Sequence, residues 1–167
     1  MTRQLQELDG ILSGLSANND FSSPDGLWFS LANPGSIWIE TDDGAYTDVT
    51  NCMLLAAVPG AVGDGGRVTV NDVDGSAGKT IDTSVGKAPG DANLRRFLVG
   101  PKESEITGIV ETPDGKTLFV NIQHPGGEPV PNFTTQAYGS NWPDGGTARP
   151  RSATIVITRN DGGLIGL

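Results

Sequence analysis

The sequence predicts an all-β protein built from two antiparallel sheet units, and three observations support this prediction. Most of its apolar segments alternate apolar and polar residues, which is the pattern of half-buried strands. The chain holds 24 glycines and 11 prolines among 167 residues, so turns separate these segments at short intervals. A similar order of strand, turn and strand also occurs twice, first near residue 24 and again near residue 105.

The N-terminal segment is the exception, because its apolar residues follow a helical period. Thr2 is a suitable N-cap, and the apolar residues after it recur at three- and four-residue spacing. We therefore expect a short helix within residues 1–20, ahead of the sheets. Its apolar face would consist of Leu5, Leu8, Ile11, Leu12 and Leu15.

The first predicted sheet unit spans residues 21–100 and begins with a hairpin. Residues 27–31 and 36–41 read as strands, and the sequence ANPG between them is typical of a tight turn. The apolar run NCMLLAA and the segment LRRFLV at residues 94–99 supply two further strands.

A long insertion separates these last two strands. Residues 59–89 are rich in Gly, Asp and Ser, and only RVTV at residues 67–70 has the composition of a strand. We therefore expect most of this insertion to be surface loop.

The second predicted unit spans residues 101–167. Strands at residues 107–112 and 117–123 are joined by PDGK, a strong turn signal. After a loop rich in Gly, Pro and Asn, SATIVITR forms a clear strand and NDGGLIGL a turn with a last short strand.

Two units of four antiparallel strands, each opened near a glycine, are typical of propeller blades. Two blades do not close a ring, so long sheet edges would need cover. Self-association would provide it, for example as a homo-oligomeric ring of three chains. The alternative is that the helix around residues 5–15 folds over the exposed apolar face.

The charge balance limits the kinds of molecule that the protein is expected to bind. With 11 Lys and Arg against 20 Asp and Glu, the net charge of −9 repels a phosphate backbone and argues against nucleic acid. Acidic groups can gather hard cations, but they also simply keep a surface soluble. No apolar run is long enough to span a membrane, and no secretory apolar segment opens the sequence. The sequence as given therefore predicts a cytoplasmic location.

Two carboxylates are the strongest candidates for a metal site. Asp25 and Glu105 each stand just before the first strand of a unit. The first strand of a blade lines the central channel of a propeller, so both side chains would point toward one axial site. Calcium accepts six to eight oxygen ligands at flexible geometry and suits such a site. The alternative is that Asp25 caps the turn PDG and Glu105 is solvated.

His124 is the chain's one histidine, and it follows directly on a strand that Pro125 ends. A single histidine cannot build a multi-histidine metal site, although three chains in a ring would bring three copies together. The alternative is that His124 orients its loop by hydrogen bonds. Cys52 lies in an apolar run, which predicts a buried, inert thiol.

Several of these segments resemble the C-terminal part of PhoX-type alkaline phosphatases. The most specific is TPDGKTLFVNIQHPG at residues 112–126. The resemblance covers most of residues 21–167 and leaves out the N-terminal helix and residues 59–89. The other matching segments are SPDGLWF, IWIETD, RRFLVGP, EITG, SNWPDG and PRSATIVITRNDGGLIG.

The resemblance implies a six-bladed propeller with an axial calcium and iron cluster that hydrolyses phosphate monoesters. The metal ions would neutralise phosphate charge and activate the attacking oxygen. Asp25 and Glu105 match the positions of calcium ligands, and His124 belongs to the family motif without an assigned role. Relatives with this fold would be periplasmic or secreted.

The chain departs from that family in length, since it holds about two blades. The blades that would supply iron ligands and phosphate-binding basic residues are absent from it. The sequence therefore suggests a fragment of a calcium- and iron-dependent phosphomonoesterase that binds a cation, with no catalytic residue assigned and its status as an enzyme open. The alternative is a non-catalytic binding or structural module that self-associates through its open sheet edges.

Overall fold

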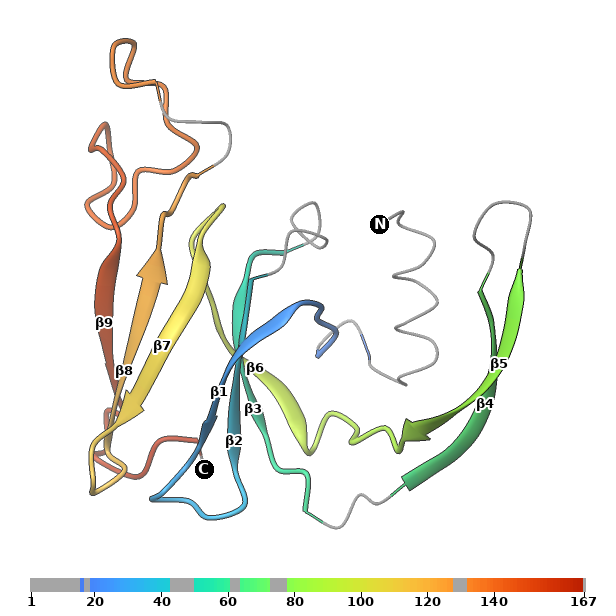
Figure 1. The fold of residues 1–167 in the computed structure, drawn as a ribbon. Coiled ribbons are helices and arrows are strands. Elements are labelled where there is room, and N and C mark those ends of the chain that lie inside the picture. The colour runs from blue at the N-terminus through green and yellow to red at the C-terminus, as the bar shows by residue number, and fades with distance from the viewer. Residues whose placement is uncertain are drawn as a thin grey trace.

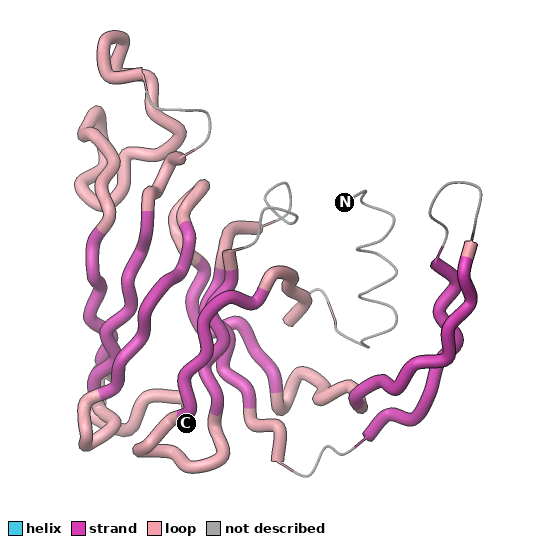
Figure 2. Tube along the Cα trace, viewed as in Figure 1, coloured by secondary structure: helices cyan, strands magenta, loops and turns pink. Residues whose placement is uncertain are grey.

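The computed structural model is all-β, as the sequence predicts (Figure 1). Its described residues contain nine strands in three antiparallel sheets and no helix, as the colouring of Figure 2 shows. They therefore include no helix with the length and apolar character needed to cross a membrane. The helix expected near the N-terminus falls almost entirely outside them. The described residues are 16, 19–42, 50–60, 64–72, 78–127 and 132–166.

The first sheet has the four strands that the sequence predicts, each paired with its neighbour in antiparallel orientation. Its order follows the chain except for one insertion, so it is a meander of the kind found in propeller blades. A bulge near the start of the first strand lies between Pro24 and Gly26. The strands, in spatial order, are β1 (Pro24–Phe29), β2 (Ile37–Thr41), β3 (Met53–Ala57) and β6 (Leu94–Val99).

The insertion between β3 and β6 forms a two-stranded ribbon of β4 (Asp64–Asp72) and β5 (Lys79–Gly86), which projects away from the two larger sheets (Figure 1). The expectation of one strand-like stretch in a surface loop was therefore wrong. The missed strand β5 lacks a period-two apolar pattern, and cross-strand polar contacts accompany its pairing. Thr69 donates to Asp82 at 2.7 Å, for example.

The second sheet consists of β7 (Glu105–Glu111), β8 (Thr117–Gln123) and β9 (Ala153–Thr158), in that order. The short strand expected after β9 is not formed in the described residues, where two turns at residues 160–161 and 165–166 flank an irregular segment. Instead Ile165 is buried in the core, and its N–H donates to the carbonyl of Gly115 at 2.9 Å. The burial of Ile165, in place of strand pairing, thus holds this C-terminal segment against the core.

The two larger sheets pack face to face, with β7 lying against β1, β2 and β3. Their shared core also buries Cys52, which confirms the prediction of a buried thiol. Apolar burial of this kind is the dominant force that holds two sheets together. The buried members of the core are Trp38, Cys52, Leu54, Ile106, Leu118, Val120, Ile122 and Ile165.

The opposite face of the first sheet holds a second apolar cluster, formed by Met53, Leu55, Ala57 and Leu94. Phe21, from the segment that precedes β1, packs on this cluster. The segment is fastened by hydrogen bonds from Asn19 to the carbonyl of Leu94 and from Arg96 to the carbonyl of Asp20. This part of the face is therefore already covered.

A single carboxylate on β7 joins the two large sheets by hydrogen bonds. Glu111 accepts the indole N–H of Trp38 at 2.9 Å and the backbone N–H of Leu31 at 3.1 Å. Burial raises the pKa of Glu111, but the hydrogen bonds from Trp38, Ser30 and Leu31 outweigh burial, and the net pKa is lowered. The ionised carboxylate is therefore the form that fits this interface.

Replacing Glu111 with Gln should lower the free energy of unfolding by about 1.5–3 kcal/mol at pH 7, the usual range for hydrogen bonds to a charged group. Because folding lowers the pKa of Glu111, its contribution exists above the ordinary carboxyl pKa and is lost as the pH falls through the folded value. Urea unfolding from pH 7 downward measures this difference.

Glu103→Gln is the matched control, because it removes one carboxylate in the turn just before β7, at the opposite end of that strand from Glu111. It should change the free energy of unfolding by much less. Equal losses for the two variants would show that Glu111 contributes only its charge.

Candidate functional site

Five polar side chains gather where β1 and β7 begin and β2 and β8 end. Antiparallel pairing brings these ends together, since Gly26 pairs with Glu40 and Glu105 pairs with Gln123. The three candidates from the sequence lie in this region together with two further carboxylates. The members are Asp25 in the bulge of β1, Glu40 and Asp42 at the end of β2, Glu105 at the start of β7 and His124 after β8.

Glu40 is the most deeply buried of these carboxylates, with 3% of the residue exposed. Its side chain lies over Gly26, where an added Cβ would collide with Oε2. A larger residue at that position would force the carboxylate to move, so Gly26 leaves room for it. The other oxygen, Oε1, is buried and has no hydrogen-bond partner among the described residues.

The electrostatic surroundings of Glu40 oppose its ionisation. Burial is the main cause, and the nearby charges of Asp25 and Glu105 add to it, so the pKa of Glu40 rises to about 7. An unpaired buried carboxylate is costly, and proteins usually offset the cost with a partner charge or a metal ion. A positively charged partner would therefore offset the cost of burying Glu40.

Glu105 experiences the same repulsion from the other sheet. Burial raises its pKa most, followed by the charge of Asp42, and Asp25 raises it further. His124 acts in the opposite direction, because its Nε2 lies 3.4 Å from Oε2 of Glu105. The balance still leaves the pKa of Glu105 raised.

The loop that carries His124 is held in place by its backbone. His124 has a positive φ of 36° and its N–H donates to the hydroxyl of Ser152 at 3.0 Å. The N–H groups of Gly126 and Gly127 donate to the carbonyls of Lys102 and Glu103. These bonds connect the loop after β8 to the turn before β7, and they place the imidazole beside Glu105.

The donor set suits a hard cation better than a transition metal, because it consists mainly of carboxylate oxygens. The Oε1 of Glu40 has no hydrogen-bond partner among the described residues, and burial together with like charges raises the pKa of both Glu40 and Glu105. In the described part of the chain, however, no group of three or more His, Cys, Asp or Glu is close enough together to hold a metal ion as it stands. The residues fit a hard cation in chemistry, and the structure leaves their convergence incomplete.

Sequence reasoning missed Glu40 and Asp42, although a signal was present for the first. The segment IWIET alternates, and Glu40 occupies the same sheet face as Trp38, which points into the core between the sheets. A charged residue on the buried face of a strand is rare without a partner and indicates a functional position. Asp42 follows the strand and carries no comparable signal.

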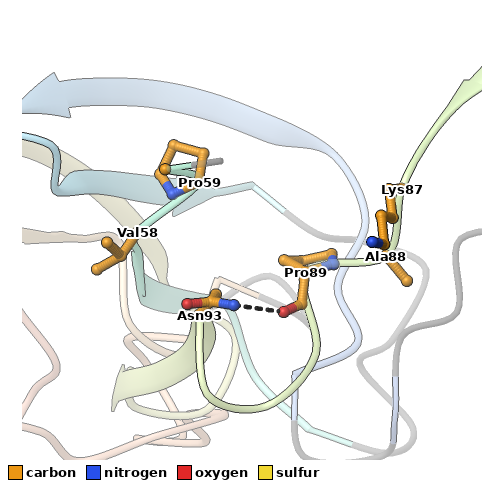
Figure 3. Close-up of a pocket in the computed structure, with 7 residues that line it drawn as sticks. Val58, Pro59, Lys87, Ala88, Pro89 and Asn93 are labelled. Carbon is orange, nitrogen blue, oxygen red and sulfur yellow. Dashed lines mark hydrogen bonds between the residues drawn. The ribbon is translucent and has the colours of Figure 1, made fainter. Parts of the chain in front are cut away.

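Two shallow pockets elsewhere lack this chemistry. One lies at the base of the β4–β5 ribbon, where Asn93 donates to the carbonyl of Pro89 (Figure 3). The other opens between β6 and the second sheet and is mainly apolar, with Trp142 in its wall. No carboxylate lines either pocket. The first is lined by Val58, Pro59, Gly60, Lys87, Ala88, Pro89 and Asn93, and the second by Leu98, Val99, Gly100, Pro101, Ile122, Trp142 and Ile155.

Comparison with known proteins identifies the family to which the chain belongs. The family model described as alkaline phosphatase PhoX matches residues 3–126, which is most of the chain. The chain therefore belongs to the PhoX alkaline phosphatase family. A search of curated proteins and a search of solved structures each gave no significant match.

The extent of the match differs from the extent expected from the sequence. The matched range begins at residue 3, so it takes in the N-terminal segment and runs across residues 59–89. It ends at Gly126, before the C-terminal segments that also suggested the resemblance. Asp25, Glu40, Asp42, Glu105 and His124 all lie inside the matched range.

The burial of Glu40 generates a pH-dependent prediction. Because folding raises its pKa from 4.5 to about 7, the folded state takes up a proton in that window and stability falls as the pH rises through it. In a chelator, Glu40→Gln should equal the wild type near pH 5 and exceed it near pH 8. The expected gain is about 1–3 kcal/mol, the usual cost of a buried polar group without a partner.

Urea unfolding of both proteins at several pH values measures this gain. Parallel pH profiles for the wild type and the variant would show that the Glu40 carboxylate is not desolvated in solution.

Proposed function

We propose that this chain is a cation-binding portion of a PhoX-family phosphatase framework, and that calcium or a similarly hard divalent ion binds between its two sheets. Asp25, Glu40, Asp42 and Glu105 would supply the oxygens. His124 would orient Glu105 from outside the set of ligands. The observation that carries this proposal is the buried, partnerless Oε1 of Glu40.

Two further features support the proposal. The carboxylates come from both sheets, so a cation bound among them would offset repulsion that the stacking of the sheets creates. The side chain of Glu40 also lies over Gly26, which leaves room for the carboxylate beside the start of β1. When bound, such an ion would neutralise the charge of a phosphate ester and polarise it toward attack.

The cation dependence predicts a direct binding result. The chelator-treated wild type should bind calcium in a titration calorimeter, and Glu40→Gln and Glu105→Gln should each weaken binding by about tenfold or more, which corresponds to 1.4 kcal/mol per factor of ten. Calcium should also raise the unfolding temperature of the wild type more than that of either variant.

Asp82→Asn on the β4–β5 ribbon is the matched control, because it removes one carboxylate there and keeps the oxygen that accepts from Thr69. It should bind calcium as the wild type does. No calcium binding by the wild type, or equal loss in the control, would refute the cation site.

Catalysis is tested separately, with a chromogenic phosphomonoester and both calcium and iron. Turnover that is abolished by Glu105→Gln and kept by Asp82→Asn would establish the chain as a phosphatase. Calcium binding without turnover would favour the second candidate, a non-catalytic binding module. The open sheet faces of the two stacked sheets, with several exposed apolar side chains in the described residues, are the observation that favours this candidate.

A further inference from the structure

Each large sheet carries exposed apolar side chains on the face that points away from the shared core. On the second sheet, Val110, Phe119 and Val156 are register partners and form one row across the three strands. Val156 is 60% exposed. On the first sheet, Leu27 and Phe29 of β1 are exposed, and Phe29 reaches 66%.

The exposed row of the second sheet has a covered counterpart in the first. Aligning IWIE with LFVN places Trp38 at the position of Phe119, and the strand registers then match on both sides. In the first sheet the corresponding row is Trp28, Trp38 and Ala56. That row packs into the core beneath the second sheet. The outward face of the second sheet therefore has the same row pattern as the face of the first sheet that the second sheet covers.

The complementary surface is repeated as well. The row of the second sheet that faces the core is Ile109, Val120 and Ile155. Its counterpart in the first sheet is Leu27, Ile39 and Leu55. Leu55 is already covered by the segment with Phe21, so the free part of this surface lies on β1 and β2.

The two residues of one hydrogen bond in the internal interface both have apolar counterparts on the exposed surfaces. Inside the chain, Glu111 accepts from Trp38 across the two sheets. The registers place Phe29 at the position of Glu111 and Phe119 at the position of Trp38. Both partners of the hydrogen bond are thus replaced by aromatic rings, which pack favourably on each other without a donor or acceptor.

We propose that a second copy of this chain docks head-to-tail, with its Leu27 and Phe29 surface on the Val110, Phe119 and Val156 row of the first copy. The contact repeats the packing of the two sheets within one chain. The rows on both surfaces consist of uncharged side chains, although the chain carries a net charge of −9, so the contact avoids the repulsion that opposes association elsewhere. This inference does not depend on the cation site.

The two surfaces differ, so the contact is heterologous and leaves one free surface of each kind on every dimer. Such contacts produce closed rings when the rotation between copies closes, and open chains when it does not. Association through sheet faces also differs from pairing of open strand edges, because it requires no new backbone hydrogen bonds.

Sedimentation velocity over a range of concentrations, in a chelator, tests the proposal. The wild type should form species larger than a monomer, either one discrete ring or a concentration-dependent series. Phe29→Glu and Val156→Glu should each weaken association by about tenfold or more, because each places a charge in an apolar contact. Circular dichroism confirms that both variants are folded.

Mixing the two variants separates a head-to-tail contact from a symmetric one. Phe29→Glu keeps an intact Val156 surface and Val156→Glu keeps an intact Phe29 surface, so the mixture should form a one-to-one dimer and nothing larger. Ile81→Glu on the ribbon is the control, because Ile81 is likewise an exposed apolar residue, at 55%. This variant should associate as the wild type does.

A wild type that stays monomeric at every concentration would overturn the proposal and assign these surfaces to a different partner. Failure of the mixed variants to form a dimer while the wild type associates would also overturn it. Repeating the runs with calcium keeps this result distinct from the cation site. The proposal predicts the same sedimentation behaviour with calcium and in the chelator, whether or not the chain binds calcium.

Discussion

The structure depends on the packing of one sheet against the other, and Glu111 is the polar residue that orients this packing. Its carboxylate accepts from the indole N–H of Trp38 in β2 and from the backbone N–H of Leu31 in the turn after β1. Apolar burial supplies most of the attraction but little direction, whereas a charged acceptor with two fixed donors selects one alignment. That alignment sets β7 beside β1 and thereby determines which strand ends meet.

The same alignment produces the least favourable electrostatics in the described structure. It buries Glu40 and Glu105 and brings Glu105 near Asp25, Glu40 and Asp42, so that burial first and the like charges second raise the pKa values of Glu40 and Glu105. Glu111 and Glu40 therefore show opposite shifts in pKa: hydrogen-bond donors outweigh burial at Glu111, whereas burial and like charges act together at Glu40. Proteins usually keep such an arrangement only where a site needs it.

The repetition of the sheet also explains why a stable pair of sheets can remain open to further stacking. The row Trp28, Trp38 and Ala56 is covered within the chain, while its counterpart on the second sheet is exposed. Repeats that bury one face on a neighbour leave a terminal face of the same kind, which is a general property of stacked units. The proposed cation site and the proposed stacking face of this all-β, PhoX-family chain are separate features.

The sequence by itself determined the strands with a period-two pattern, such as β6 and β8, and the placement of Asp25 and Glu105 at equivalent strand starts. Local alternation and turn chemistry suffice for these features. Tertiary structure decided the pairing of β5, the use of Ile165 as a core residue in place of a last strand, and the burial of Glu40 over Gly26. Each of these depends on contacts between residues distant in the chain, which no local pattern records.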